Sequence, residues 1–230
     1  LTYEAYLRWN TDASAMVNNL AESYEISEDA SEFTFHIPTG MRWSDGEPFT
    51  ADDIVSAYQD GLLNKDLTPT ISPNYRDPAN GEPMVVEKLD DQTIVFKFAS
   101  PYGLFLEILG NWGVEWPIHY LKQFHPTYTP MSELEPKIKA AGFTNWWELF
   151  GNRNTWENPE KPCIWAWHPE RVPPDVPSVW ERNPYYWKVD AEGQQDALLP
   201  GDALLQDLER LLEAVAVLGA ADNVLDPLPG

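Results

Sequence analysis

Within one short stretch of the chain, the period of the apolar residues changes from two residues, typical of a strand, to about 3.6 residues, typical of a helix. In "SEFTFHIPTG", apolar and polar residues alternate from Phe33 to Ile37, which predicts a half-buried strand. Thr50 then precedes "ADDIVSAYQDGL", where apolar residues recur at helical spacing, and Asp53 completes a capping-box pattern. A strand followed by an amphipathic helix over 51–63 predicts a mixed α/β fold.

Four carboxylates lie close to Trp43 in the same stretch: Asp45, Glu47, Asp52 and Asp53. Acids beside a tryptophan can form a sugar-cleaving site, or they can belong to a turn and a capped helix. Asp45 precedes Gly46, a pair typical of turns. Asp52 and Asp53 fall in the first turn of the predicted helix, where the helix dipole favours negative charge. The pattern therefore indicates structural roles for these acids.

The other expected elements follow the same two patterns. Strands 85–89 and 93–98 are predicted to form a hairpin that turns at Asp90 and Asp91, in one sheet with 33–37. Further helices are predicted over 102–110, 117–124, 132–143 and 144–150. Residues 3–9 and 14–20 are expected to be helical or irregular, 152–179 mostly irregular, and 178–189 a strand that breaks at Asn183.

The composition excludes several classes of function. The formal charge is −22 and the pI is about 4.3, so nucleic acid and anionic membrane surfaces would be repelled. The single cysteine, Cys163, allows no internal disulfide. We interpret it as a buried thiol rather than as a nucleophile paired with His168. No stretch approaches the ~18–20 apolar residues that span a bilayer, and no signal peptide opens the sequence.

Several ordered blocks of the chain resemble one known family. The blocks are "LAESYEISEDASEFTFHIPTGMRWSDGEPFTADDIVSAYQDGLL" (20–63), "LDDQTIVFKFASPYGLFLEIL" (89–109), "PIHYLKQF" (117–124) and "ERNPYYWKVDAEG" (181–193). They are similar to the family 5 extracellular solute-binding proteins, the oligopeptide- and dipeptide-binding receptors of bacterial ABC importers. The resemblance implies a type II periplasmic-binding-protein-like fold, a peptide or oligosaccharide ligand, a membrane permease as partner and no enzyme activity.

The resemblance also implies how the chain is organised. Residues 1–195 are expected to be an incomplete N-terminal lobe, and residues 196–230 a non-family tail with one amphipathic helix over 202–218. Members of the family close two lobes around the ligand, so this chain alone is expected to bind weakly. Its expected location is periplasmic or extracellular, anchored through an N-terminal lipoprotein signal that the sequence does not contain.

The predicted ligand-facing surface is the loop 111–116 with the segment 163–167. Both carry aromatic residues between Pro and Gly, where rings are less often part of a core, and the resemblance places both near the cleft. The predicted ligand-binding residues are Asn111, Trp112, Trp116, Trp165 and Trp167. No cofactor and no metal site is predicted.

The alternative hypothesis is a carbohydrate-active enzyme such as a glycoside hydrolase, which needs two carboxylates across a cleft. The candidates are Glu115, beside Trp116, and Glu148, beside Trp147, although nothing in the sequence pairs them. His119 and His125 do not have the spacing of a His-Glu-x-x-His zinc site, and we interpret both as solvated surface residues.

Overall fold

The computed structural model describes residues 4–110, 115–172, 174 and 177–189. The chain divides into two units after Trp187, and the fold below is that of the first unit. The expected tail, with its helix over 202–218, lies outside the described residues, as do Asn111 and Trp112. In the described part of the chain, every helix is too short or too polar to cross a membrane.

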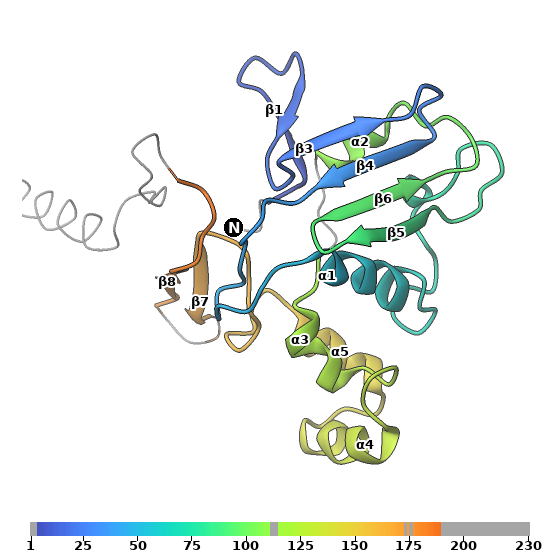
Figure 1. Cartoon of the computed structure of the whole chain (residues 1–230). Coiled ribbons are helices and arrows are strands. Elements are labelled where there is room, and N and C mark those ends of the chain that lie inside the picture. The colour runs from blue at the N-terminus through green and yellow to red at the C-terminus, as the bar shows by residue number, and fades with distance from the viewer. Residues whose placement is uncertain (1–3, 111–114, 173, 175–176, 190–230) are drawn as a thin grey trace, which may run out of the picture. The chain divides into compact units, whose positions relative to one another are not determined.

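A four-stranded antiparallel sheet forms the centre of the unit, in the order β3 (Ser23–Ile26), β4 (Glu32–His36), β6 (Thr93–Lys97) and β5 (Val85–Asp90) (Figure 1). Phe33 pairs with Phe96 across β4 and β6, and both side chains are buried. The strands expected at 33–37, 85–89 and 93–98, and their common sheet, are confirmed.

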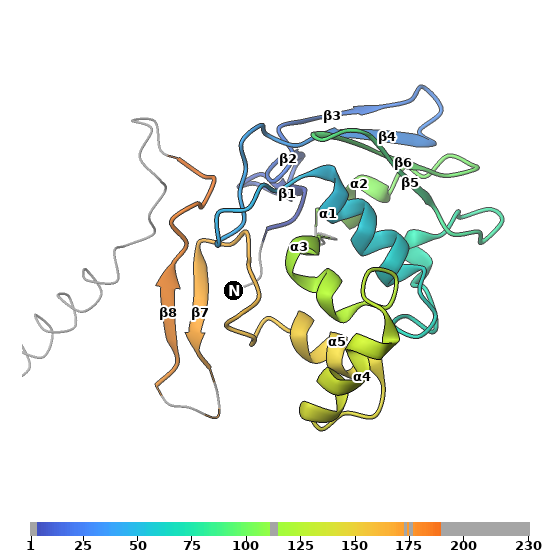
Figure 2. The ribbon, with the colours of Figure 1, turned by 60° about the horizontal axis from the view of Figure 1, so that its bottom comes forward.

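Two helices cover one face of this sheet, as Figure 2 shows. Helix α1 (Ala51–Ser56) buries Ile54, and α2 (Phe105–Leu109) buries Phe105 in the same cluster as Phe33. The Phe105 ring centroid lies 5.1 Å from that of Phe33 and 4.8 Å from that of Phe98. Alternation along β4 and helical spacing along α1 therefore bury one common core.

Two predicted helices differ from the observed ones at their ends. Helix α1 continues as a π-helix over Ala57–Leu62, so this final part is wider than an α-helix. Helix α2 begins at Phe105 rather than at residue 102. The Tyr102 N–H donates to the Ala30 carbonyl at 2.8 Å, which holds the start of that segment to the β3–β4 turn.

A second helical layer contains α3 (Ile118–Leu121), a 3₁₀ turn (Lys122–Phe124), α4 (Met131–Ala140) and α5 (Trp146–Asn154). The helices predicted over 117–124, 132–143 and 144–150 are confirmed with shifted ends. Asn145 and Glu148 form a capping box at the start of α5, and Gly142, at φ +78°, follows the end of α4. The layer has its own small core, formed by Leu121, Phe124, Leu134, Ile138, Trp146, Leu149 and Phe150.

Two hairpins were not expected. Residues 3–9 and 14–20 contain β1 (Leu7–Trp9) and β2 (Met16–Asn18), an antiparallel pair, so the helical alternative is wrong there. Strands of three residues are too short to show a period of two. The mostly irregular stretch 152–179 contains β7 (Trp167–Arg171), which pairs with β8 (Val179–Arg182). Pro169 weakens the sequence signal for β7, because proline cannot donate a backbone hydrogen bond to a neighbouring strand. A register shift follows Pro169 in the structure.

Two shorter elements complete the described fold. The strand expected from residue 178 is confirmed as β8, and it ends just before Asn183. A 3₁₀ turn over Pro73–Tyr75 lies in the long connection between the π-helix and β5.

Candidate functional site

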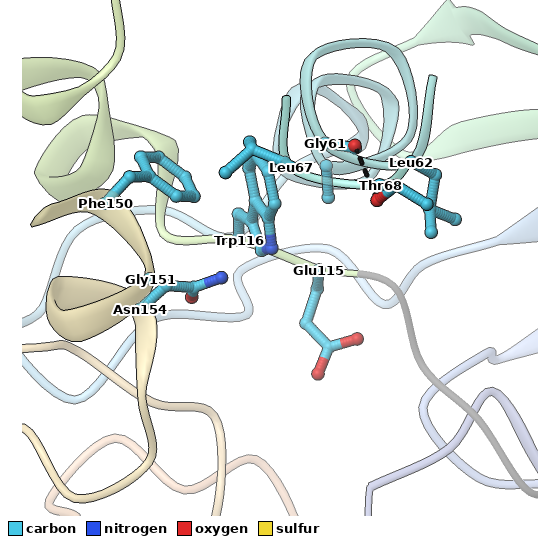
Figure 3. Close-up of a pocket in the computed structure, with 10 residues that line it drawn as sticks. Gly61, Leu62, Leu67, Thr68, Glu115, Trp116, Phe150, Gly151 and Asn154 are labelled. Carbon is cyan, nitrogen blue, oxygen red and sulfur yellow. Dashed lines mark hydrogen bonds between the residues drawn. The ribbon is translucent and has the colours of Figure 1, made fainter. Parts of the chain in front are cut away.

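A cavity of about 350 Å³ lies between the π-helix, residues 115–116 and helix α5 (Figure 3). Its apolar wall includes Leu62, Leu67, Trp116 and Phe150. The polar groups at the cavity come from a few residues, chiefly Glu115 and Asn154. An apolar, aromatic wall with few polar groups is typical of small-molecule sites.

The π-helix shapes one wall of this cavity. A Cβ atom at Gly61 would come within 2.2 Å of the Trp116 ring, so only glycine lets the indole pack there. The Trp116 ring also packs against Phe150, with ring centroids 4.8 Å apart. The Thr68 hydroxyl donates to the Gly61 carbonyl at 3.0 Å, which ties the following loop to the same turn.

Asp53 holds the backbone segment that carries Trp116. Its carboxylate accepts from the backbone N–H of Thr50 at 2.9 Å and of Ile118 at 3.1 Å. Its backbone carbonyl accepts from the Trp116 N–H at 3.2 Å. Burial raises the pKa of Asp53 to about 6, against the effect of these hydrogen bonds. The expected capping role is confirmed, and the same side chain positions the cavity.

Two acceptor atoms of the cavity residues have no hydrogen-bond partner in the described part of the chain. They are Oε2 of Glu115 and Oδ1 of Asn154, both withdrawn from solvent. Burial raises the pKa of Glu115 to about 8, and the nearby charge of Lys161 opposes that rise. The Lys161 ammonium donates to the Asn154 carbonyl at 2.8 Å, and burial lowers its pKa to about 8. The cavity therefore offers hydrogen-bond acceptors beside an aromatic face.

The second acid of the enzyme hypothesis has another role. The Glu148 carboxylate accepts from the N–H groups of Thr144 and Asn145, at 2.9 and 2.8 Å, and it does not line the cavity. These bonds lower its pKa, as expected for a helix cap. Among the described residues, no group of three His, Cys, Asp or Glu side chains could hold a metal ion.

The acids near Trp43 have structural partners. Asp45 contacts His119 at 2.8 Å, and Asp52 pairs with Lys88 at 2.8 Å. Asp45 also accepts from the Glu47 N–H at 3.2 Å within the predicted turn, and Asp52 lies in the first turn of α1, so both predicted roles are confirmed, as is the Asp53 cap.

The surface interpretation of the two histidines is wrong for His125, which is 1 % exposed. Its ring packs against Trp146 and Phe150, with centroids at 4.8 and 5.4 Å. His119 is partly buried and paired with Asp45. Sequence spacing did not predict this because the rings that bury His125 come from α5, which lies further along the chain.

The predicted ligand-binding residues do not all lie together. Trp116 lines the cavity. Trp165 packs partly buried against the main core, and Trp167 starts β7 opposite Arg182, so neither is among the cavity residues. Asn111 and Trp112 lie outside the described residues.

Cys163 is a buried thiol, as expected, and burial raises its pKa. Its backbone N–H donates to the Ser44 hydroxyl at 3.0 Å, and its carbonyl accepts from the Ser44 N–H at 2.9 Å. His168 is directed elsewhere, with Nε2 at 3.3 Å from the Lys161 carbonyl oxygen.

Sequence reasoning missed Gly61, Asn154 and Lys161 as residues in or next to the cavity. The one available signal was Gly61, an isolated glycine inside a helical pattern, which often has a packing reason.

Comparison with known proteins decides the family. The family described as "Bacterial extracellular solute-binding proteins, family 5 Middle" matches residues 15–199. The chain belongs to this family.

Similar family 5 proteins include binding proteins for two kinds of solute. The "Periplasmic alpha-galactoside-binding protein" of Rhizobium meliloti is 35% identical over 181 residues, which cover 77% of this chain and 24% of that protein. A structure of "oligopeptide-binding protein OppA" has a TM-score of 0.78 and 41% identity, over 83% of this chain and 30% of that one. The binding protein MelB from Agrobacterium fabrum, solved in complex with stachyose, has a TM-score of 0.64 and 31% identity, over 84% of this chain and 28% of that one.

These comparisons confirm the predicted family and the predicted mixed α/β fold, which is similar to that of type II periplasmic binding proteins. The similar proteins are binding proteins and not enzymes, and nothing among them favours a glycoside hydrolase. The chain spans about a quarter to a third of the length of these relatives.

Proposed function

We propose that the chain is part of the solute-binding component of an ABC-type importer, which captures an oligosaccharide or an oligopeptide and delivers it to a membrane permease. The observation that carries this is the cavity beside Trp116, where an aromatic face lies next to unpartnered acceptors in a chain of this family. Such a site suits capture of a solute, because it combines an aromatic face with hydrogen-bonding groups.

Each ligand class is supported by a relative. The alpha-galactoside-binding protein and the stachyose complex favour an oligosaccharide, and the OppA structure favours an oligopeptide. Trp116 is the proposed contact within the cavity, with Trp165, Trp167, Asn111 and Trp112 as further proposed contacts. The proposed location is periplasmic or extracellular, with anchoring through a lipoprotein signal encoded upstream of this sequence.

Calorimetric titration of the chain tests this function with two ligand sets, a raffinose and stachyose mixture and a pool of di- to pentapeptides. We expect saturable binding of one set, weakened at least ~10-fold by Trp116→Ala, since ~1.4 kcal/mol corresponds to a factor of ten. Trp147→Ala is the control, because Trp147 is 37% exposed and lies outside this cavity. Absence of binding to both sets would contradict the proposal.

A further inference from the structure

The size of the cavity beside Trp116 limits what can enter it. Its volume of about 350 Å³ lies near the lower end of the ~300–1,000 Å³ typical of small-molecule sites. One six-membered ring with its substituents fits such a space, whereas an extended chain of several residues does not. The whole cavity is built from one unit of the chain, so this wall exists before any second surface closes on a ligand.

The walls of the cavity differ in chemistry. Trp116 and Phe150 present aromatic surface, and Leu62 and Leu67 extend it. Figure 3 shows the Glu115 carboxylate pointing away from these leucines, and the nitrogen of the Asn154 amide pointing toward Trp116. An aromatic face attracts polarised C–H groups, because its π-system is negative. A matching ligand therefore has one face of C–H groups and an edge of hydrogen-bond donors.

The polar edge requires donors from the ligand. Oε2 of Glu115 and Oδ1 of Asn154 are buried acceptors without a partner in the described part of the chain. Leaving such atoms unpaired costs free energy, which a donor from a ligand would recover. Hydroxyl groups can donate to these oxygens and can accept from the proton of a neutral Glu115 carboxyl, and they bring no charge.

The charges around the cavity select against ions. Lys161 places its ammonium against the backbone carbonyl of Asn154, so a second cation is disfavoured there. Burial favours the neutral form of Glu115, which removes the attraction a carboxylate would give to a cation. Two unpaired acceptor oxygens also disfavour an anion. A neutral polyol is the remaining class.

We propose that the cavity between the π-helix and α5 is a subsite for one neutral sugar ring, which stacks on Trp116 and forms hydroxyl hydrogen bonds with Glu115 and Asn154. This inference rests on the proposed function and narrows its ligand class to carbohydrate. Gly61 and Asp53 hold the Trp116 segment in place, so the stacking face is already formed in the free protein.

The test uses the chain with D-galactose and D-glucose as probes, and with glucosamine and glucuronate as charged analogues, by ligand-observed NMR titration at pH 6.5. Gly151→Leu adds a bulky side chain to the cavity lining, and a Cβ atom at Gly151 meets nothing within 4 Å. Asn152→Leu is the matched control, since it adds the same side chain to an exposed neighbouring position of α5 outside the cavity. Melting temperatures establish that each variant is folded.

We expect a neutral hexose to bind, and Gly151→Leu to weaken that binding at least ~10-fold, while Asn152→Leu leaves it within ~2-fold. The charged analogues should bind at least ~10-fold more weakly than the neutral sugar. Asn154→Leu and Glu115→Leu remove the acceptors and should each weaken binding ~5- to 10-fold, with Glu115→Gln weaker in effect than Glu115→Leu. The two acceptor variants keep the test decisive if Gly151→Leu does not fold.

Three results would overturn the inference. Unchanged hexose binding in Gly151→Leu and in the acceptor variants would place the sugar elsewhere. If a charged analogue bound as tightly as the neutral hexose, the charges around the cavity would not select against ions. Binding of the peptide pool with no binding of a hexose or raffinose would refute the sugar subsite and leave the proposed function standing, whereas no binding of either class would overturn both.

Discussion

Gly61 lies so close to the indole of Trp116 that a Cβ atom at position 61 would come within 2.2 Å of the ring carbon Cη2 and 2.4 Å of Cζ2. Gly61 belongs to the π-helix, whose wider turn places it against the cavity. π-Helical segments often occur at functional sites. The position of the Trp116 ring in the wall of the proposed site therefore depends on the backbone of the π-helix at Gly61.

We predict that Gly61→Ala destabilises the protein. In an ordinary helix this substitution stabilises by ~0.5–1 kcal/mol. Here the new methyl group must displace Trp116, and overpacking of this kind costs ~1–3 kcal/mol, so the clash outweighs the gain. Urea unfolding should show a lower free energy of unfolding, and Trp fluorescence a changed emission maximum.

Gly103→Ala is the control for that substitution, because a Cβ atom there meets nothing within 4 Å. It should leave the emission maximum unchanged. A Gly61→Ala protein as stable as the parent, with the same emission, would show that Trp116 does not depend on Gly61.

We predict that Glu115→Gln stabilises the protein increasingly from pH 4.5 to pH 8. The Glu115 pKa is raised from 4.5 to about 8 on folding, so the folded state keeps a proton that the unfolded state releases. The stability this proton gives is complete below pH 4.5 and is lost as pH rises through 8. The pKa of Lys161 is lowered from 10.5 to about 8, so its effect on stability falls above pH 8 and outside this pH range. Melting temperatures across the pH range measure the effect.

Glu148→Gln is the matched control, with the opposite sign. Hydrogen bonds from Asn145 and Thr144 lower the Glu148 pKa, so its stabilisation is present above its ordinary pKa and is lost as pH falls. This variant should therefore be less stable than the parent at neutral pH and equal to it in acid. Parallel curves for both variants would contradict the assigned environments.

Much of the fold could be predicted from local patterns. Phe33 and Phe96 lie on alternating strands, and Ile54 lies on a helix capped by Thr50 and Asp53, so each pattern reports which face is buried. The patterns failed where tertiary contacts decide the backbone. The three-residue strand β1 is too short for a period, and Pro169 weakens the strand signal of β7.

The site could be predicted only in part. Trp116 stood out as an aromatic residue beside a proline, and it lines the cavity. Asn154 comes from the end of α5, and the burial of Glu115 depends on tertiary packing. Sequence spacing does not predict that these groups lie together, because helix packing brings them into contact with one cavity.

We predict that the two adjacent tryptophans of α5 differ sharply in their contribution to stability. Trp146 is 7% exposed, packs against His125 and donates its ring N–H to Asp66 at 3.2 Å. Trp146→Ala should lower the free energy of unfolding by ~3–5 kcal/mol, as for other buried aromatic residues. Trp147 is 37% exposed, so Trp147→Ala should cost less than ~1 kcal/mol. Equal losses in chemical denaturation would contradict the burial of Trp146.

The last prediction concerns His125 and acid. Its ring is buried, its Nε2 atom lies 3.2 Å from the Asp60 carbonyl oxygen, and its Nδ1 atom accepts from the Thr127 N–H at 3.2 Å. Both contacts suit a neutral ring with its proton on Nε2. Burial lowers the His125 pKa below its ordinary value of 6.5, although Asp60 opposes this.

The sign of the effect follows from the lowered pKa of His125. Above pH 6.5 the ring is neutral in both folded and unfolded states, so its full packing contribution is present. As pH falls below 6.5 the unfolded state takes up a proton first, and stability is lost through the folded pKa. Urea unfolding at pH 7.5 and pH 5 should therefore show a larger loss for the parent than for His125→Gln, which cannot titrate. In NMR, the midpoint of the His125 ring titration should lie below 6.5. A ring that titrates above that value, or equal losses in the two proteins, would show that His125 is solvated in solution.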